Sequence, residues 1–241
     1  MGVGVVPLDD PARAIVEVDW AINEGLHALW IPHRAPIDRS PGHVELEGFW
    51  ARLAEAQVPF VLHVGGAPLQ VSKSWGNNGR APVKDWLGGG ENVRTKDAAV
   101  LHQTPEMFLS VLLLDGVFER HPGLRGAAVE LGAGWVPEMC RRLDWVTRIY
   151  GRSDKSVRFH RTPSQQLIEQ MAFTPFSHED VAYLMDDSHP DLYLFSSDYP
   201  HLEGTKDPIG RFERFLENAE PSVRDAFYSE NFLRLWPNAR V

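Results

Sequence analysis

The feature of this 241-residue sequence that most constrains its fold is an alternation of short apolar segments with longer amphipathic segments. Short apolar runs are typical of buried β-strands, and the stretches between them repeat apolar residues with a helical period. Strands that alternate with helices require a parallel sheet covered by helices, in either an open doubly wound sheet or a (β/α) barrel. No GxGxxG or GxxxxGK[ST] motif follows any strand, which weakens the Rossmann and P-loop alternatives. We predict six strands, in the ranges 3–8, 27–32, 59–64, 124–131, 170–176 and 192–198.

The helical segments contain recognisable start and stop residues. Asp10 followed by Pro11 predicts the N-cap and first turn of the first helix, and Gly25 predicts its end. Apolar residues that include Val16 and Trp20 are predicted to form its buried face. Further helices are predicted in the ranges 44–57, 105–118, 135–150 and 208–236, with the last broken at residue 221.

Composition and charge exclude several classes of protein. Apolar residues make up 43% of the chain, so disorder is not expected, and no apolar run reaches transmembrane length. The net charge of −9 argues against a nucleic-acid partner or an anionic membrane. A lone Cys140 cannot form an internal disulfide, and the start of the chain lacks the basic region of a signal peptide. The sequence therefore predicts a cytoplasmic protein with neither a nucleic-acid nor a membrane partner.

Ionisable residues occur near the ends of three predicted strands. His63 lies near the end of one strand, Glu130 near the end of the next, and Asp198 at the end of the last. The carboxyl ends of parallel strands meet at one edge of a sheet, where α/β proteins keep their chemistry. A charge buried at a strand end is costly unless it is compensated, and a divalent metal is a strong compensation. These residues together predict a metal site.

Each of these residues also has a purely structural explanation. His63 could be a neutral core histidine that hydrogen-bonds to the backbone. Asp198, before Tyr199 and Pro200, could start a turn or cap a helix. Glu130 could pair with a nearby arginine. The coincidence of all three at one sheet edge favours the metal site over these separate explanations.

A long polar segment, residues 65–100, interrupts the alternation of strands and helices and is rich in glycine. Loops of this length in a compact domain are often lids or binding loops, so we expect this segment to close over the site. Arg80 and Trp86 are candidates to hold an aromatic acid, although such arginines are commonly ordinary surface charges. His33, which follows the second strand, is either a pocket residue or a solvent-exposed loop histidine.

Four ordered segments resemble one known family over nearly the whole chain. FSSDYPHLEG, residues 195–204, resembles the GSDYPH motif of the amidohydrolase-related family, and PFVLHVGG, residues 59–66, is similar to the family strand with a metal-binding histidine. GVFERHPGLRGAAVELGAGWVPEM, residues 116–139, is similar to the most recognisable stretch of that family, and residues 10–32 are similar to its early helix and strand. The resemblance is to the branch that includes aminocarboxymuconate-semialdehyde decarboxylase and related decarboxylases and hydrolases.

The resemblance implies a single domain over residues 1–241, folded as a distorted (β/α)8 TIM-like barrel with one divalent metal, zinc or alternatively manganese, at its C-terminal face. It implies that His63 and Asp198 bind the metal and that Asp198 is the catalytic acid or base. Glu130 lies beside Leu131, where many members have a further histidine, and is a candidate third ligand. His201, within the same motif as Asp198, is expected to face the substrate or support the ligands.

The sequence departs from the family at its start. The family opens with a strand that bears a His-x-His pair, and this sequence contains no such pair. Six predicted strands instead of the eight of a full barrel indicate a chain that lacks N-terminal strands, whose unpaired sheet edge favours aggregation or a homodimer. The resemblance favours a carboxy-lyase that acts on an aromatic or unsaturated carboxylic acid. A hydrolase of C–N, C–O or C–C bonds and a catalytically inactive barrel fragment remain the alternatives.

Overall fold

A five-stranded parallel sheet forms the centre of the computed structural model, which describes residues 2–34, 36–66, 71–81, 95–154, 158–201 and 204–239. Strands that are consecutive in the sequence are neighbours in the sheet, with no reversal of order. A doubly wound sheet requires such a reversal, so the order is that of part of a (β/α)8 barrel. The predicted α/β fold is therefore confirmed. The strands are β1 Val3–Val5, β2 Ala28–Trp30, β3 Phe60–His63, β4 Gly126–Val129 and β5 Met171–Phe173.

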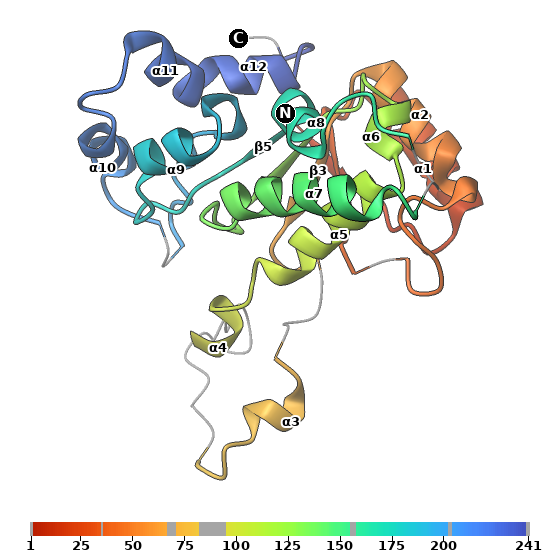
Figure 1. Ribbon diagram of the computed structural model, residues 1–241, viewed down its shortest axis with the longest axis horizontal. Helices are drawn as coiled ribbons and strands as arrows, with labels where there is room; N and C mark the ends of the chain where they lie inside the picture. The colour runs from red at the N-terminus through yellow and green to blue at the C-terminus, as the bar shows by residue number, and fades with distance from the viewer. Residues whose placement is uncertain are drawn as a thin grey trace.

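Helices connect the strands and cover the outer face of the sheet (Figure 1). They are α1 Pro11–Asn23, η1 Val44–Leu46, α2 Glu47–Ala56, α3 Lys73–Gly76, α4 Thr95–Ala98, α5 Gln103–Leu114, α6 Val117–Arg120, α7 Val136–Tyr150, α8 Pro163–Gln170, α9 Val181–Asp187, η2 Pro190–Leu192, α10 Pro208–Phe215, α11 Pro221–Asp225, η3 Ala226–Glu230 and α12 Asn231–Leu235. The sequence analysis did not predict α8 or α9. A capping box marks the start of α8, because Thr162 and Gln165 each accept the backbone N–H of the other.

The sixth predicted strand, residues 192–198, is wrong. Its pairing with the sheet is limited to a single parallel bridge between Tyr193 and Phe173 and the N–H of Leu194, which donates to Phe173 O at 2.9 Å. The next residue, Phe195, donates its N–H to Phe227 O at 3.0 Å, and its ring packs against the rings of Phe227 and Tyr228. The C-terminal helices thus draw the chain away from the sheet before it reaches the candidate site.

The first helix has the predicted ends but not the predicted buried face. Asp10 accepts the Arg13 N–H at 3.1 Å, and Gly25 has a φ of 74°, which glycine adopts without strain. However, Val16 and Trp20 are 66% and 54% exposed. These two residues are four positions apart, on the side of α1 opposite its contacts with the sheet and α2. The buried residues of α1 are Ala14, Val18 and Ala21.

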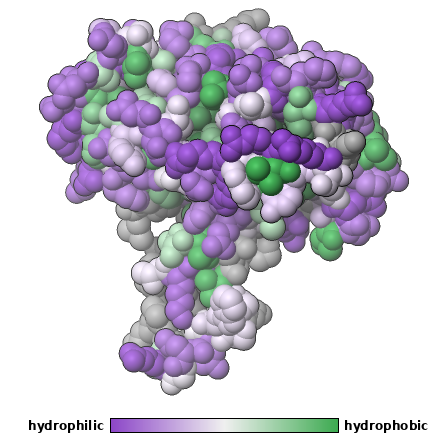
Figure 2. All heavy atoms as spheres, in the orientation of Figure 1, coloured by the Kyte–Doolittle hydropathy of each residue, from purple (hydrophilic) through white to green (hydrophobic). Residues whose placement is uncertain are grey.

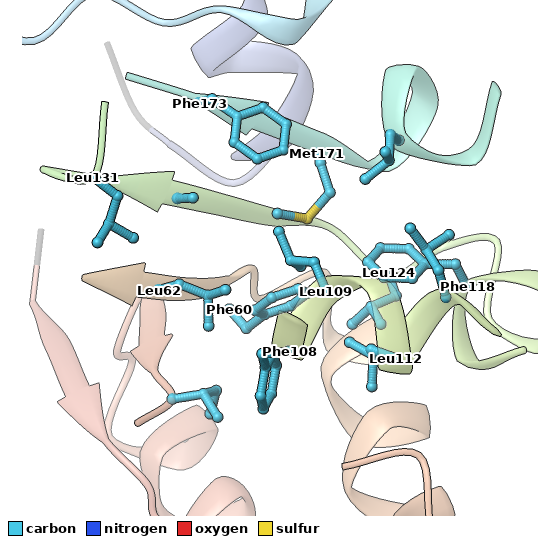
Figure 3. Close-up of a cluster of buried hydrophobic side chains, with 14 of the residues drawn as sticks. Phe60, Leu62, Phe108, Leu109, Leu112, Phe118, Leu124, Leu131, Met171 and Phe173 are labelled. Carbon is cyan, nitrogen blue, oxygen red and sulfur yellow. The ribbon is translucent and has the colours of Figure 1, made fainter. Parts of the chain in front are cut away.

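The sheet has a hydrophobic core on each face. On the outer face, large side chains from β3 and β5 meet those of α5 and α6, as Figure 3 shows. Gly126 in β4 permits this packing, because a Cβ there would lie 2.6 Å from the ring of Phe60 and 2.8 Å from Met171 Sδ. The inner face carries small strand residues, namely Ala28, Val61, Ala127 and Ala172. Leu194, Leu235 and Trp236 from later in the chain pack against them.

The edge of the sheet at β1 is unpaired within the described part of the chain. β1 pairs with β2 alone, and Val3 and Val5 are 56% and 54% exposed. An exposed apolar edge strand is a template for pairing with another chain. Among the described residues, no helix is long and apolar enough to cross a membrane.

We expect the protein to associate with itself through β1, as the sequence analysis predicted. Val5→Lys places a charge on the strand edge and should shift the protein toward the monomer in analytical ultracentrifugation. Val16→Lys adds the same charge to an exposed position of α1 without blocking the strand edge, so it is the matched control. A wild-type protein that stays monomeric at its highest soluble concentration would contradict the expectation.

Candidate metal centre

Four polar side chains from three segments gather near the C-terminal ends of β3 and β4. His63 is the last residue of β3, and Glu130 directly follows β4. Asp198 and His201 lie in a turn closed by the His201 N–H, which donates to Asp198 O at 2.9 Å. The sequence analysis placed His63, Glu130 and Asp198 at a common edge of the sheet, and the structure adds His201 as a direct neighbour of both carboxylates.

Glu130 lies between two imidazoles. Its Oε2 is 2.8 Å from His63 Nε2, and its Oε1 is 3.2 Å from His201 Nδ1. The side chain is only 12% exposed, so it has little water to solvate its charge. The structural alternative for Glu130 was a pair with an arginine, whereas the contacts observed are with histidines.

Asp198 completes a group that can hold a cation. Its Oδ1 is 3.8 Å from His201 Nδ1, and one ligand atom each from Glu130, Asp198 and His201 lie within 4.8 Å of one another. Donor atoms around one divalent ion lie about 3–4 Å apart, because each bond is about 2.0–2.2 Å long. A small contraction would therefore bring these three ligands onto one ion.

His63 presents one ring nitrogen to this group. Its Nδ1 donates to the Val64 carbonyl at 2.7 Å, which leaves Nε2 directed at Glu130. In the neutral ring Nε2 then carries a lone pair, the form that binds metals, and a carbonyl partner on the other nitrogen fixes that tautomer. In the protonated ring the same atom donates to Glu130.

The pKa values of the site residues show how strongly they interact. The hydrogen bond to Glu130 raises the pKa of His63, although burial opposes this effect. Burial would raise the pKa of Glu130, but the hydrogen bonds and charges of His63 and then His201 outweigh it and lower that pKa. Both directions favour a carboxylate beside an imidazolium when no cation is present.

Both carboxylate residues have a left-handed backbone. The φ angles are 57° at Glu130 and 50° at Asp198, which are uncommon for residues with a side chain. Such conformations cost about 1–3 kcal/mol each and cluster at functional sites, although they also occur at helix ends such as Gln57. Contacts hold them in place: the Glu130 N–H donates to Thr174 Oγ1 at 3.1 Å, and a Cβ at Gly204 would lie 2.6 Å from Asp198 O.

Thr174 and Glu179 are supporting residues that the sequence analysis missed. Thr174 directly follows β5, so its position at a strand end was the available indication. The Glu179 carboxylate accepts the backbone N–H groups of Ala133, Gly134 and Phe176, at 3.0, 2.6 and 2.6 Å. These bonds fix the turn after β4 and so the position from which Glu130 projects.

His33 is a buried neighbour of the site. Its side chain follows β2 and is only 6% exposed, which rules out the solvent-exposed loop histidine. Burial, with a further effect from the charge of His63, lowers its pKa to about 4. A Cβ at Gly66 would lie 2.7 Å from His33 Nδ1, so the ring packs tightly on the backbone that follows β3.

Within segment 65–100, the two described helices lie apart from the body of the protein. α3 and α4 are on an arm that projects away from the sheet (Figure 1). Arg80 is exposed on this arm, and no interaction among the described residues joins it to Glu130 or Asp198. Trp86 lies outside the described residues. The lid and the substrate-binding roles of these two residues stay predictions.

Glu130→Gln is expected to lower the pKa of His63 in metal-free protein, because the amide removes the negative charge that stabilises the imidazolium and leaves burial to favour the neutral ring. An NMR titration of the histidine side chains, with a chelator present, measures this change. Glu47→Gln is the matched control, since Glu47 contacts His121 at 2.8 Å and not His63. An unchanged His63 titration in the Glu130 variant would show that the two groups do not interact in solution.

Solved structures of three other proteins are similar to this structure. An amidohydrolase from Mycobacterium avium subsp. paratuberculosis K-10 is 28% identical with a TM-score of 0.77, over 96% of this chain and 57% of that one. 5-Carboxyvanillate decarboxylase from Sphingomonas paucimobilis is 18% identical with a TM-score of 0.66, over 98% and 66%. Dihydroxybenzoic acid decarboxylase from Polaromonas sp. JS666, solved with manganese and an inhibitor, is 18% identical with a TM-score of 0.60, over 98% and 68%.

The comparison with curated proteins gave no match. At 18% identity the two decarboxylases show a shared fold alone. The chain spans 57% of the length of the mycobacterial amidohydrolase. A family model described as amidohydrolase matches residues 1–237, nearly the whole sequence. The chain therefore belongs to the amidohydrolase family.

Proposed function

We propose that this protein is a metal-dependent decarboxylase that removes CO2 without oxidation from an aromatic or unsaturated carboxylic acid. The observation that carries the proposal is the group formed by Glu130, Asp198 and His201, whose ligand atoms lie within 4.8 Å of one another, with His63 on Glu130. Membership of the amidohydrolase family supports a metal-dependent enzyme. The similar fold of two decarboxylases of aromatic acids supports the choice of reaction.

The residues present fit a divalent metal. Two carboxylates and two imidazoles supply the oxygen and nitrogen donors that zinc and manganese accept. Glu130, Asp198 and His201 would hold the ion, with His63 Nε2 as a fourth ligand. The sequence favours zinc, and the manganese of the Polaromonas enzyme makes that metal the main alternative. When bound, the metal supplies a Lewis acid that polarises an oxygen of the substrate.

Asp198 is the proposed proton donor. As the bond between the ring carbon and the carboxylate breaks, its electron pair remains on the ring carbon and CO2 leaves. That carbon then takes a proton from the Asp198 carboxyl group, which regains one from solvent. His201, within 3.8 Å of Asp198, orients this carboxyl group. The Asp198 side chain is only 19% exposed, and this partial burial limits its contact with water.

The substrate is proposed to be a small carboxylic acid held by residues around this group. His33 is neutral near pH 7, because its pKa is lowered to about 4, so it can offer an uncharged N–H donor. Arg80 and Trp86 are proposed to contact the acid and its ring from segment 65–100, as the sequence analysis suggested.

There are two alternatives to a decarboxylase. A hydrolase would use Asp198 to take a proton from water instead of giving one to carbon. A catalytically inactive barrel fragment is the second alternative, since the sequence has no His-x-His pair and spans 57% of the mycobacterial enzyme. The proposed roles therefore concern the residues of this chain, and an activity assay has to show whether these residues are sufficient for catalysis.

Purified protein is expected to contain about one zinc or manganese ion per chain by elemental analysis. His63→Ala and Glu130→Gln should reduce this content, because each removes a ligand or its partner.

Asp198→Asn should lower CO2 release from a dihydroxybenzoate or a carboxyvanillate by about 100-fold or more, the usual effect of losing a general acid. Glu47→Gln, distant from the site, serves as the control for folding.

The products separate the three alternatives. CO2 and a decarboxylated ring support the proposal, whereas cleavage products without CO2 support the hydrolase. Protein that binds neither metal after reconstitution, and whose thermal unfolding a chelator leaves unchanged, would support the inactive fragment.

A further inference from the structure

A cleft lies beside α7 and shares no residue with the candidate metal centre. The cleft has a volume of about 1360 Å³ and lies between α7 and residues 158–163. Figure 2 shows this side of the molecule, where mainly hydrophilic side chains surround a few hydrophobic ones over α7. Pockets that hold small molecules commonly have volumes of about 300–1,000 Å³, so this cleft has room for an extended ligand.

One stripe of α7 and the turn after it supplies three of the six arginines that line the cleft. Arg141, Trp145, Arg148 and Arg152 follow each other at intervals of four, three and four residues. This spacing places them on one side of α7 and of the turn that ends it. Arg158 lines the same cleft from the opposite wall. Two walls therefore direct guanidinium groups toward one space.

The acidic side chains of the cleft are already engaged. Glu138 lies 3.2 Å from Arg141 at the rim. The carboxylate of Asp144 accepts the N–H and hydroxyl of Ser164 at 2.9 and 2.6 Å, where it caps the start of α8. These are the two acids in the lining, against six arginines, so the cleft is strongly positive in a chain whose net charge is −9.

Three of the six arginines have no acidic partner among the described residues. Arg141, Arg142 and Arg161 form salt bridges with acids outside the cleft, namely Asp187, Glu106 and Glu169. No salt bridge within the described part of the chain involves Arg148, Arg152 or Arg158, and all three are exposed. A concentration of like charges without counter-ions favours an anionic ligand.

Aromatic rings occur among these arginines. Trp145 is 48% exposed, although tryptophan is one of the most apolar side chains, and Phe159 lines the opposite wall. A flat ring can stack on such side chains, and guanidinium groups bind phosphate oxygens through paired hydrogen bonds. The cleft thus combines a surface for an aromatic ring with a set of phosphate-binding groups.

We propose that this cleft binds a nucleotide, with the phosphates on Arg148, Arg152 and Arg158 and the base against Trp145. A second copy joined by two-fold symmetry across this cleft is a poorer occupant, because it would bring the same positive surface against this one. The concave shape and the aromatic side chains beside arginines match a small ligand that carries both a ring and several negative charges. This site is independent of the proposed decarboxylase activity.

Isothermal titration with ATP, with a chelator present to remove metal ions, tests the proposal. We expect ATP to bind, tripolyphosphate to bind more weakly and adenosine to bind at least about tenfold more weakly than ATP, because most of the affinity comes from charge-assisted hydrogen bonds. Arg148→Ala combined with Arg152→Ala should weaken ATP binding about tenfold or more. Trp145→Ala should weaken ATP but leave tripolyphosphate unchanged.

The matched control is Arg211→Ala combined with Arg214→Ala, which removes two exposed arginines of α10 outside the cleft. This variant should bind ATP like the wild type, as should His63→Ala, which affects the candidate metal centre. No ATP binding at millimolar concentration, or equal loss in the cleft and control variants, would overturn the proposal. ATP binding that Trp145→Ala leaves unchanged would overturn the assignment of the base.

Discussion

The interaction on which the candidate site depends is the contact of one carboxylate with two imidazoles. Glu130 is only 12% exposed, and a buried carboxylate without a partner is destabilised by several kcal/mol. His63 and His201 provide the compensating hydrogen bonds from two other segments. The charge of one residue therefore ties the end of β3 and the turn at residues 198–201 to the end of β4.

The surrounding fold sets the positions of these groups. The parallel register of β3 and β4 pairs His63 with Val129. Glu130 therefore lies one residue beyond the position opposite the end of β3. The left-handed backbone at Glu130 and Asp198 then turns both residues away from the directions a regular strand would give. Thr174 and Glu179 hold the turn after β4, which contains the left-handed backbone of Glu130. A divalent cation at this place would replace the imidazolium as the compensating charge, because both types of charge satisfy the same carboxylate.

Sequence patterns predicted the parts of the fold that depend on local chemistry. The Asp10 cap and the five strands from β1 to β5 follow from turn residues and apolar runs, and the structure has all of them. The patterns failed where tertiary contacts decide. Residues 192–198 form an apolar run like a strand, but packing of Phe195 on Phe227 takes them out of the sheet. Val16 and Trp20 were predicted to be buried because they are apolar, but they are exposed. Hydrophobicity alone does not show which side of a helix faces a neighbour.

The candidate site also combines residues that local sequence indicates with residues that tertiary structure places. The ends of predicted strands indicated His63, Glu130 and Asp198, although the segment before Asp198 is not a strand in the structure. The position of His201 depends on a turn that no periodicity describes. The proposed role of Glu130, Asp198 and His201 is to bind one cation together. Anomalous diffraction from a crystal grown with manganese would locate that cation. We expect one peak within about 2.0–2.3 Å of ligand atoms of all three residues. A peak elsewhere, or no peak while Glu130 still contacts His63 and His201, would contradict it.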